Sequence, residues 1–370
     1  MRFRLLVVLS VCLLAGCAST QEASQDEGPG ETKPVQKSQE GDEKETSAAD
    51  EKGVREGKWE IRGTELFVRD VGPKDAPVLL VIHGGPGGNH RSLRPLQALT
   101  PDYRVVLFDQ RGTGKSERLN VTPKKPESLR KLSLKQNVED IEAIRKKLGK
   151  EKISIIGHSW GGTLATFYAL AHPKNVEKLI VYSGGPETGE LAKQKNEAHK
   201  SRLNEKEKAK LAEKKKALEK AIGNGATQEK LDEIFADMAA VMMPSLYCER
   251  PATIPEDIGR AGFWAGQVAK KYRKSFHYKA VADGLERIEA PTLLTWGSCE
   301  PSPRERLTNL LGHLPNARLV IFGESGHNAM EEQRDLFFRT IRAFLAGESL
   351  PMDTYTSKDE LPDKNGDEES

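Results

Sequence analysis

Short apolar runs alternate with amphipathic segments through the middle of this 370-residue chain. The apolar runs predict strands at residues 59–62, 65–70, 78–82, 104–108, 153–156, 178–182, 292–295 and 318–322. The first two are expected to form a hairpin that turns at Gly63, and helical patterns such as residues 134–148 separate most of the others. Strands that alternate with helices predict an α/β fold with a mostly parallel sheet, whose ligand site lies at the carboxyl ends of the strands.

Residues 186–285 interrupt this alternation. A very charged stretch at 191–220 predicts an exposed amphipathic helix with a narrow apolar stripe, and a second, more apolar helix follows it. The apolar positions of the two helices are Leu203, Leu211, Leu218, Ile222, Leu231, Ile234, Phe235, Met238 and Met242. Because the insertion falls after the sixth strand, we expect a helical cap that sets substrate choice, on a core formed by residues 58–185 and 286–346.

The start of the chain predicts export. Residues 1–16 combine a basic beginning with an apolar stretch too short to span a membrane, which is typical of a signal peptide. Its end, Leu-Ala-Gly-Cys at 14–17, resembles the lipobox of bacterial lipoproteins, which implies cleavage before Cys17 and lipidation of that residue. Ala18 then favours the outer membrane, on its periplasmic or surface face. An ordinary secretory signal with an incidental cysteine is the alternative.

Composition separates the two ends from the core. Residues 17–57 are polar and charged and are expected to be a disordered tether, and residues 347–370 an acidic disordered tail. The whole chain has a net charge of +2, but the core alone holds 48 basic and 36 acidic residues, a net charge of +12. No nucleic-acid-binding module is recognisable, so the excess predicts attraction to the acidic ends or to an anionic membrane surface rather than to nucleic acid.

The most informative motif is Gly-His-Ser-Trp-Gly at residues 157–161, between the strand pattern 153–156 and a helix-like segment. A serine between two glycines at a strand-to-helix junction is typical of the nucleophile elbow of serine hydrolases, because larger side chains would collide with the tight turn. Ser159 is therefore the candidate nucleophile. Taken alone, the motif also fits a glycine-rich turn with an incidental serine.

A serine hydroxyl needs a histidine base that a carboxylate orients, in the chain order serine, acid, histidine. Among eight histidines, only His327 follows Ser159 directly after a predicted strand, 318–322. Glu300 follows the preceding strand and is the candidate acid. Nearby carboxyl groups that compete for this role are those of Asp283, Glu305 and Glu324.

A glycine-rich loop, His-Gly-Gly-Pro-Gly-Gly at 83–88, follows the strand 78–82. Its backbone N–H groups and that of Trp160 are expected to bind the negative oxygen of a tetrahedral intermediate. Phosphate binding is the competing interpretation of such loops. Gly-Lys-Ser at 114–116 resembles the end of a P-loop, but position 109 holds Asp where that motif has glycine.

Together, residues 83–88, the Phe-Asp-Gln-Arg-Gly-Thr-Gly-Lys-Ser segment at 108–116, and residues 157–162 resemble the α/β-hydrolase fold. More narrowly, they are similar to the proline iminopeptidase (prolyl aminopeptidase) family of serine peptidases. The resemblance implies Ser159 as nucleophile, His327 as base, Glu300 as acid, and Gly85 with Trp160 as oxyanion donors. Two positions depart from the family. Glu300 stands where aspartate is usual, and the histidine at 158 is more frequent in esterase-type members.

The cap supplies candidates for substrate binding. An aminopeptidase needs a carboxylate for the free ammonium of its substrate, and Glu249 is the best candidate, with pairing to Arg250 as the alternative. Trp264 is expected to line a pocket or to be ordinary core. Cys248 and Cys299 either form a disulfide between cap and core or stay as free thiols.

These features predict a serine hydrolase that forms an acyl-enzyme on Ser159, without metal or cofactor. The leading hypothesis is an aminopeptidase that releases N-terminal proline or small apolar residues from peptides. A carboxylesterase or amidase with the same residues is the alternative, and a non-catalytic surface lipoprotein that binds a partner through its charged cap is a hypothesis of another class. The sequence leaves the oligomeric state open.

Overall fold

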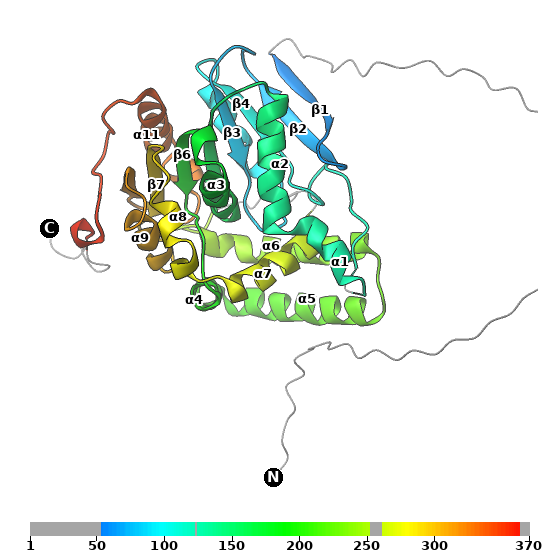
Figure 1. The fold of residues 1–370 in the computed structure, drawn as a ribbon. Coiled ribbons are helices and arrows are strands. Elements are labelled where there is room, and N and C mark those ends of the chain that lie inside the picture. Colours follow the sequence, from blue (N-terminus) through cyan, green and yellow to red (C-terminus); the bar gives the residue numbers. More distant parts are fainter. Residues whose placement is uncertain (1–52, 123, 252–260, 363–370) are drawn as a thin grey trace, which may run out of the picture. The chain divides into compact units, whose positions relative to one another are not determined.

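The computed structural model describes residues 53–122, 124–251 and 261–362. Within this part, eight strands form one sheet in the order β1-β2-β4-β3-β5-β6-β7-β8 (Figure 1). Their bounds are β1 Val54–Glu60, β2 Glu65–Val71, β3 Val78–Ile82, β4 Arg104–Phe108, β5 Ile153–His158, β6 Val176–Tyr182, β7 Thr292–Gly297 and β8 Ala317–Phe322. β2 runs antiparallel to β1 and β4, and all other neighbouring strands are parallel. The predicted α/β fold with a mostly parallel sheet is confirmed.

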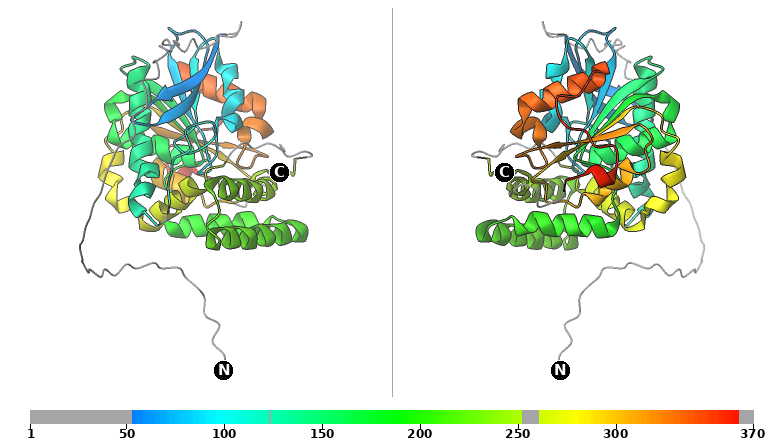
Figure 2. Two further views of the ribbon diagram at one scale, coloured as in Figure 1. Left: turned by 90° about the vertical axis from the view of Figure 1, so that its right-hand side faces the viewer. Right: turned by 90° about the vertical axis from the view of Figure 1, so that its left-hand side faces the viewer.

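Helices cover both faces of the sheet, as the alternation of apolar side chains within the strands requires. In β3, Leu80 belongs to the core cluster that contains α2 (Leu134–Lys147), α3 (Trp160–Ala171) and α9 (Glu305–Leu311). The neighbouring Leu79 belongs to the cluster on the opposite face, which contains η1 (His90–Leu99) and α11 (Arg334–Ala346) (Figure 2). The short helices around this core are α1 Pro126–Leu129, η2 Arg130–Leu132, η3 Pro173–Asn175, α10 Ala329–Glu332 and η6 Lys358–Glu360.

The described residues between β6 and β7 are mostly helical and form the cap. It contains α4 Gly189–Ser201, α5 Glu205–Gly223, α6 Gln228–Met242, η4 Met243–Leu246, α7 Phe263–Ser275, η5 Tyr278–Ala280 and α8 Ala282–Leu285. Helices α5 and α6 lie side by side beyond one end of the sheet (Figures 1 and 2). None of the helices in the described part of the chain is long and apolar enough to cross a membrane.

The charged stretch that predicted a single helix over 191–220 forms two helices, so that prediction is wrong. The chain breaks before Asn204, whose side-chain oxygen accepts a hydrogen bond from the backbone N–H of Glu207 at 2.9 Å. The Glu207 carboxylate accepts from the backbone N–H of Asn204 at 2.8 Å. This reciprocal capping box starts a new helix at a point where the charge pattern shows no interruption.

The chain after α11 differs from the expected disordered tail. The backbone groups of Tyr355 and Leu319 exchange two hydrogen bonds, of 2.9 and 2.8 Å, at the edge of β8. Leu350 and Met352 pack against the core cluster of the α11 face. The expectation of disorder is therefore wrong as far as residue 362. The tether was expected to extend to residue 57, but residues 54–57 belong to β1 and pair with β2, so the expectation of disorder is wrong there. The expected signal peptide, Cys17 and the tether up to residue 52 lie outside the described residues, as do residues 363–370.

Candidate active site

Ser159 stands at a sharp turn between β5 and α3. Its φ of 54° and ψ of −117° lie outside the regions that side chains favour, and its backbone N–H donates to the carbonyl of Tyr182 at 2.9 Å. A Cβ at Gly157 would collide with the carbonyl of Gly161, and a Cβ at Gly161 with the carbonyl of Ile82. The two glycines are therefore required by close backbone packing, as expected for a nucleophile elbow.

Glu300 and His327 follow β7 and β8, which are neighbours in the sheet. His327 Nδ1 lies 2.8 Å from Glu300 Oε1, and both side chains are buried. Because a carboxylate only accepts, Nδ1 carries the hydrogen and Nε2 of the neutral ring is left as the basic nitrogen. This is the tautomer that a general base for serine needs.

Glu300 has a second cationic partner in Arg306 of α9. The guanidinium donates from Nη2 to the same oxygen, Oε1, at 3.0 Å, and stacks over Trp296 at 5.1 Å. Burial opposes ionisation of Glu300, but the charges of His327 and Arg306 and the hydrogen bond from His327 outweigh it and lower the pKa of this carboxyl. Glu300 is therefore ionised throughout the neutral range.

The competing carboxyl groups lie in different surroundings. Asp283, Glu305 and Glu324 are all exposed, whereas Glu300 is buried against the imidazole. Of these four acids, Glu300 is the one that contacts His327 in the described structure, and it occupies the expected position after the seventh strand. A glutamate reaches the imidazole here although the resembling family uses a shorter aspartate.

The glycine-rich loop after β3 lies directly on the elbow. A Cβ at Gly84 would approach the Cβ of Ser159 to 3.0 Å, and Gly85 has a φ of +120° that favours glycine. Trp160 begins α3, so its backbone N–H is in the first turn of that helix. Of the two residues expected to supply oxyanion donors, Trp160 therefore follows Ser159 in the chain, and Gly85 follows Gly84, which lies against Ser159.

The segment at 108–116 supports this loop and is not built for phosphate. Gln110 donates from its backbone N–H to His83 Nε2 at 3.0 Å and from its side chain to the His83 carbonyl at 2.7 Å. Asp109 accepts hydrogen bonds from the backbone N–H groups of His90 and Lys115, each at 2.7 Å. A buried carboxylate at this position is incompatible with a P-loop, which presents backbone N–H groups to an anion.

His158 is a residue of the site to which the sequence assigned no role. Its Nε2 lies 3.0 Å from the carbonyl oxygen of His327, so Nε2–H donates, and its ring stacks 4.7 Å from that of His327. Burial, followed by the charge of His327, lowers the pKa of His158 to about 3, so this ring stays neutral. His199 of α4 approaches from the cap, with its ring 6.3 Å from that of His327. The signal for His158 was its unusual presence in the elbow, whereas nothing in the sequence pointed to His199.

The two cap residues predicted to bind substrate lie in different places. Trp264 packs against the cluster of Leu119, Val121 and Leu132 and stacks on Phe263 at 4.8 Å. Trp264 therefore packs between α7 and the core, and its role in substrate binding stays a prediction. Glu249 is exposed in the loop after η4, and Arg250 pairs with Glu207 at 2.7 Å instead of with Glu249.

Glu187 is a buried carboxylate at the junction of core and cap that sequence reasoning missed. It accepts hydrogen bonds from Lys195 at 2.5 and 2.8 Å and pairs with Arg273 at 2.6 Å. Arg306 lies 3.6 Å away on its other side. Burial would raise the pKa of Glu187, but the three cations lower it to about 2. Its charge is thus already neutralised by the protein.

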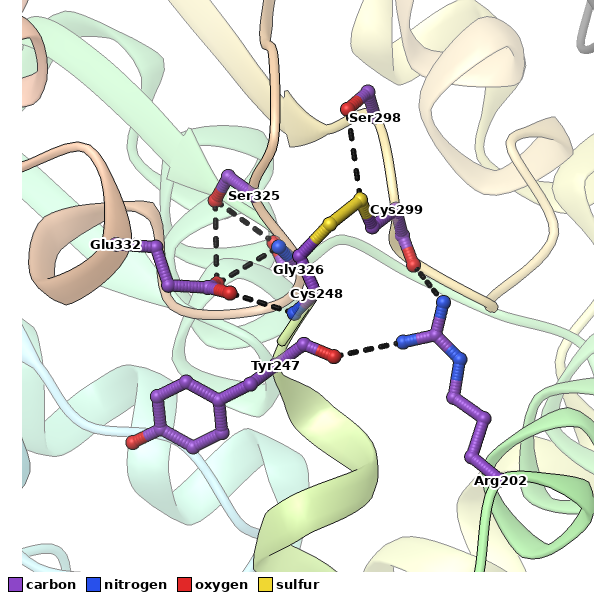
Figure 3. Close-up of a disulfide and its surroundings, with 8 residues drawn as sticks. All are labelled: Arg202, Tyr247, Cys248, Ser298, Cys299, Ser325, Gly326 and Glu332. Carbon is purple, nitrogen blue, oxygen red and sulfur yellow. Dashed lines mark hydrogen bonds between the residues drawn. A yellow bond between two sulfur atoms is a disulfide. The ribbon is translucent and has the colours of Figure 1, made fainter. Parts of the chain in front are cut away.

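Cys248 and Cys299 are paired in the structure, so the alternative of a disulfide between cap and core applies (Figure 3). Their Cα atoms lie 5.1 Å apart, and the two residues are separated by 51 positions in the chain. Cys299 directly precedes Glu300. The bond therefore ties the cap to the loop that carries the candidate acid.

Comparison with known proteins gives one family match, to the alpha/beta hydrolase fold, over residues 77–333. The chain is 28% identical to a proline iminopeptidase of Saccharolobus solfataricus, over 79% of this chain and 92% of that protein. It is 30% identical to the proline iminopeptidase PfmaB of Pestalotiopsis fici, over 77% of this chain and 98% of that protein. Among solved structures, a proline iminopeptidase of Mycobacterium smegmatis superposes with a TM-score of 0.54 at 20% identity, over 79% of this chain and 98% of that one.

Proposed function

Because this chain belongs to the alpha/beta hydrolase fold family and is a serine hydrolase, we propose that it is an aminopeptidase that releases N-terminal proline or small apolar residues from peptides. Ser159 is the nucleophile, His327 the base and Glu300 the acid. The observation that supports these roles best is the 2.8 Å hydrogen bond from His327 to a buried Glu300, next to a serine held in a strained turn.

The reaction follows from the tautomer of His327. Its Nε2 takes the proton of the Ser159 hydroxyl while the serine oxygen bonds to the substrate carbonyl carbon. The N–H groups of Gly85 and Trp160 stabilise the oxygen that becomes negative. The imidazolium then gives its proton to the leaving nitrogen, which departs and leaves an acyl-enzyme. Water attacks the acyl group with His327 again as base, and Ser159 is released.

The proposed aminopeptidase activity rests on two relatives that are proline iminopeptidases and that this chain matches over most of their length. Such an enzyme needs a carboxylate that meets the free ammonium of its substrate. Glu187 does not suit this role because three cations already surround it. We assign the ammonium contact to Glu249, which is exposed beside the disulfide.

A carboxylesterase or amidase is the second candidate, and two observations favour it. His158 occupies the elbow position at which the resembling peptidase family commonly lacks histidine, and the cations around Glu187 leave the buried charge there net positive. An ester substrate carries no ammonium and needs no carboxylate partner. The two activities share Ser159, His327 and Glu300 and differ in what the cap recognises.

The deciding experiment compares a proline arylamide with p-nitrophenyl esters of short acids, with Ser159→Ala as the blank. Turnover of the arylamide, with a KM that rises in Glu249→Gln while the KM for esters stays constant, is the expected result. Turnover of esters alone removes the peptidase activity and leaves the esterase. If a fluorophosphonate probe fails to label Ser159, the chain is not a hydrolase of this kind and partner binding through the cap becomes the better hypothesis.

We also propose that the protein is a lipoprotein held at the outer membrane through Cys17. The sequence Leu-Ala-Gly-Cys at 14–17, after a short apolar segment, supports this proposal. Metabolic labelling with an alkyne fatty acid should mark the wild-type protein and not the Cys17→Ala variant, and the labelled protein should sediment with outer membranes. Equal labelling of both proteins, or of neither, contradicts the lipid anchor.

A further inference from the structure

A short segment of the cap, residues 246–248, runs directly against the loop that carries His327. The backbone N–H of His327 donates to the carbonyl of Leu246 at 2.6 Å. A Cβ at Gly326 would lie within 3.0 Å of the backbone nitrogen of Cys248. The two main chains therefore touch with no side chain between them, and the acceptor for the backbone N–H of His327 belongs to the cap.

The disulfide fastens this segment to the core. Cys248 ends the cap segment, and its partner Cys299 directly precedes Glu300 (Figure 3). The backbone N–H of Cys299 donates to the carbonyl of Ser325 at 2.9 Å, within the loop before His327. One covalent bond thus joins the cap segment, the loop of the acid and the loop of the base.

Glu332 of α10 provides a second fastening at the same place. One of its carboxylate oxygens accepts from the backbone N–H of Cys248 at 2.6 Å, and the other from the backbone N–H of Gly326 at 2.8 Å. The Ser325 hydroxyl lies 3.4 Å from the second oxygen. A single carboxylate therefore bridges the cap segment to the residue immediately before His327, as Figure 3 shows.

Arg202, between α4 and α5, completes the set from the cap side. It donates from Nη1 to the carbonyl of Tyr247 at 2.9 Å and from Nη2 to the carbonyl of Cys299. The first acceptor lies in the cap segment and the second in the loop of Glu300, the two segments that the disulfide joins. Three independent groups, the disulfide, Glu332 and Arg202, thus hold residues 246–248 in one position.

The other peptide group of His327 is held from the core. His158 donates to the His327 carbonyl at 3.0 Å, so the backbone of His327 is fixed on one side by the elbow and on the other by the cap. If the cap segment moves, the peptide groups of His327 keep only the bond from His158, and its side chain keeps the bond to Glu300. A displacement of about 1 Å at a reacting group costs on the order of 10²-fold in rate, so the position of residues 246–248 bears on proton transfer from Ser159.

We propose that the cap segment 246–248 positions His327, with Glu332 as a positioning residue and the Cys248–Cys299 disulfide as a fastening that a dithiol reductant can open. This inference rests on the proposed function, in which His327 is the base. A thiolate of the reductant attacks one sulfur and displaces the other as a thiolate. Its second thiol then releases the first sulfur, which leaves two cysteine thiols and one cyclic disulfide of the reductant. Both cysteines are partly exposed, so the reagent can reach them.

The test uses the purified full chain with p-nitrophenyl esters and a fluorophosphonate probe. Glu332→Gln removes one of the two acceptors. Glu324→Gln is the matched control, because Glu324 is an exposed glutamate in the loop between β8 and α10. We expect kcat and the rate of labelling of Ser159 to fall roughly ten- to a hundredfold in Glu332→Gln, with little change in KM. In Glu324→Gln, kcat and the rate of labelling should stay as in the wild type. Unchanged kcat in Glu332→Gln overturns its role.

Reduction supplies the second arm. Wild-type protein is treated with a dithiol until titration finds two more free thiols than in the untreated protein, with an unchanged circular dichroism spectrum. It should then lose kcat to a similar extent and recover it on reoxidation. The Cys248→Ser/Cys299→Ser variant should start at the lower kcat and ignore the dithiol. Should that variant not fold, reduction of the folded wild type and Glu332→Gln decide the matter. Full kcat after the thiols of Cys248 and Cys299 are both released shows that the disulfide only stabilises the fold, and overturns its positioning role. Failure of the untreated wild type to turn over or label contradicts the proposed function instead.

Discussion

Replacing Glu300 by glutamine is the sharpest test of the proposed site, because the structure specifies what is lost. Both donors, His327 Nδ1 at 2.8 Å and Arg306 Nη2 at 3.0 Å, reach the same oxygen, Oε1. Arg306 cannot accept a hydrogen bond, so it selects the amide oxygen of the glutamine for this position. His327 then keeps its tautomer, and the substitution removes the negative charge while preserving the hydrogen bonds.

The magnitude follows from the charge alone. An imidazolium and a carboxylate about 4 Å apart between charge centres attract by about 4 kcal/mol at an effective dielectric constant of about 20. Loss of that attraction when His327 accepts the proton of Ser159 raises the barrier by the same amount, which corresponds to about 10³-fold in kcat. Arg306 stays as a buried cation near the imidazolium, so this factor is a lower bound.

The assay is steady-state hydrolysis of a p-nitrophenyl ester, together with the rate of fluorophosphonate labelling of Ser159. Glu305→Gln is the matched control, since Glu305 is an exposed acid in the neighbouring helix α9 and should leave kcat unchanged. Unfolding curves in urea confirm that both variants are folded. A loss below about tenfold in a folded Glu300→Gln protein is too small for the loss of this charge and refutes Glu300 as the acid of the site.

Three further predictions concern stability. Gly161→Ala places a methyl group against a backbone carbonyl, so it should lower the free energy of unfolding in urea by about 3 kcal/mol or more and abolish labelling of Ser159 by a fluorophosphonate probe. A stable variant that is still labelled contradicts the packing of the elbow. Hydrogen bonds from Arg145 lower the pKa of Glu142 to about 2, so the stability that Glu142 contributes is complete above about pH 5 and is lost as the pH falls toward 2. Glu142→Gln should therefore lower the free energy of unfolding by about 1–3 kcal/mol at pH 7 and by much less near pH 2; a difference independent of pH argues against this account. The Cys248–Cys299 bond closes a loop with a sequence separation of 51, for which chain entropy predicts a stabilisation of about 4 kcal/mol. The Cys248→Ser/Cys299→Ser variant should therefore lose about 2–4 kcal/mol of the free energy of unfolding in urea. Equal stability of the two proteins contradicts a disulfide in the folded state.

Much of the core could be predicted because its signals are local. Apolar runs of strand length, separated by helical patterns, depend only on the periodicity of neighbouring residues. The elbow around Ser159 is likewise local, since Gly157 and Gly161 are required by a turn that spans five positions. Ser159, Glu300 and His327 follow β5, β7 and β8, and a parallel sheet brings the carboxyl ends of its strands to one edge, so their meeting could be expected from the strand pattern.

The cap was predicted less well, because its contacts are long-range. The charge pattern over 191–220 did not reveal the break before Asn204, where a capping box, and not a breaker residue, starts the new helix. Trp264 packs on the cluster of Leu119, Val121 and Leu132, which lies far away in the chain. The chain after α11 is polar and acidic, yet Tyr355 bonds to the edge of β8, where an open strand offers unpaired backbone groups.

The fold class and the candidate nucleophile, Ser159, could be predicted from the sequence alone, since both depend on spacing within short segments. The tertiary structure alone decided which acid contacts His327, because Glu300 differs from the exposed Glu305 and Glu324 by burial and not by residue type. It also decided that the cap reaches the backbone of His327 through residues 246–248. Such contacts join positions about 80 residues apart, and no local pattern encodes them, because they arise only when separate elements pack into one structure.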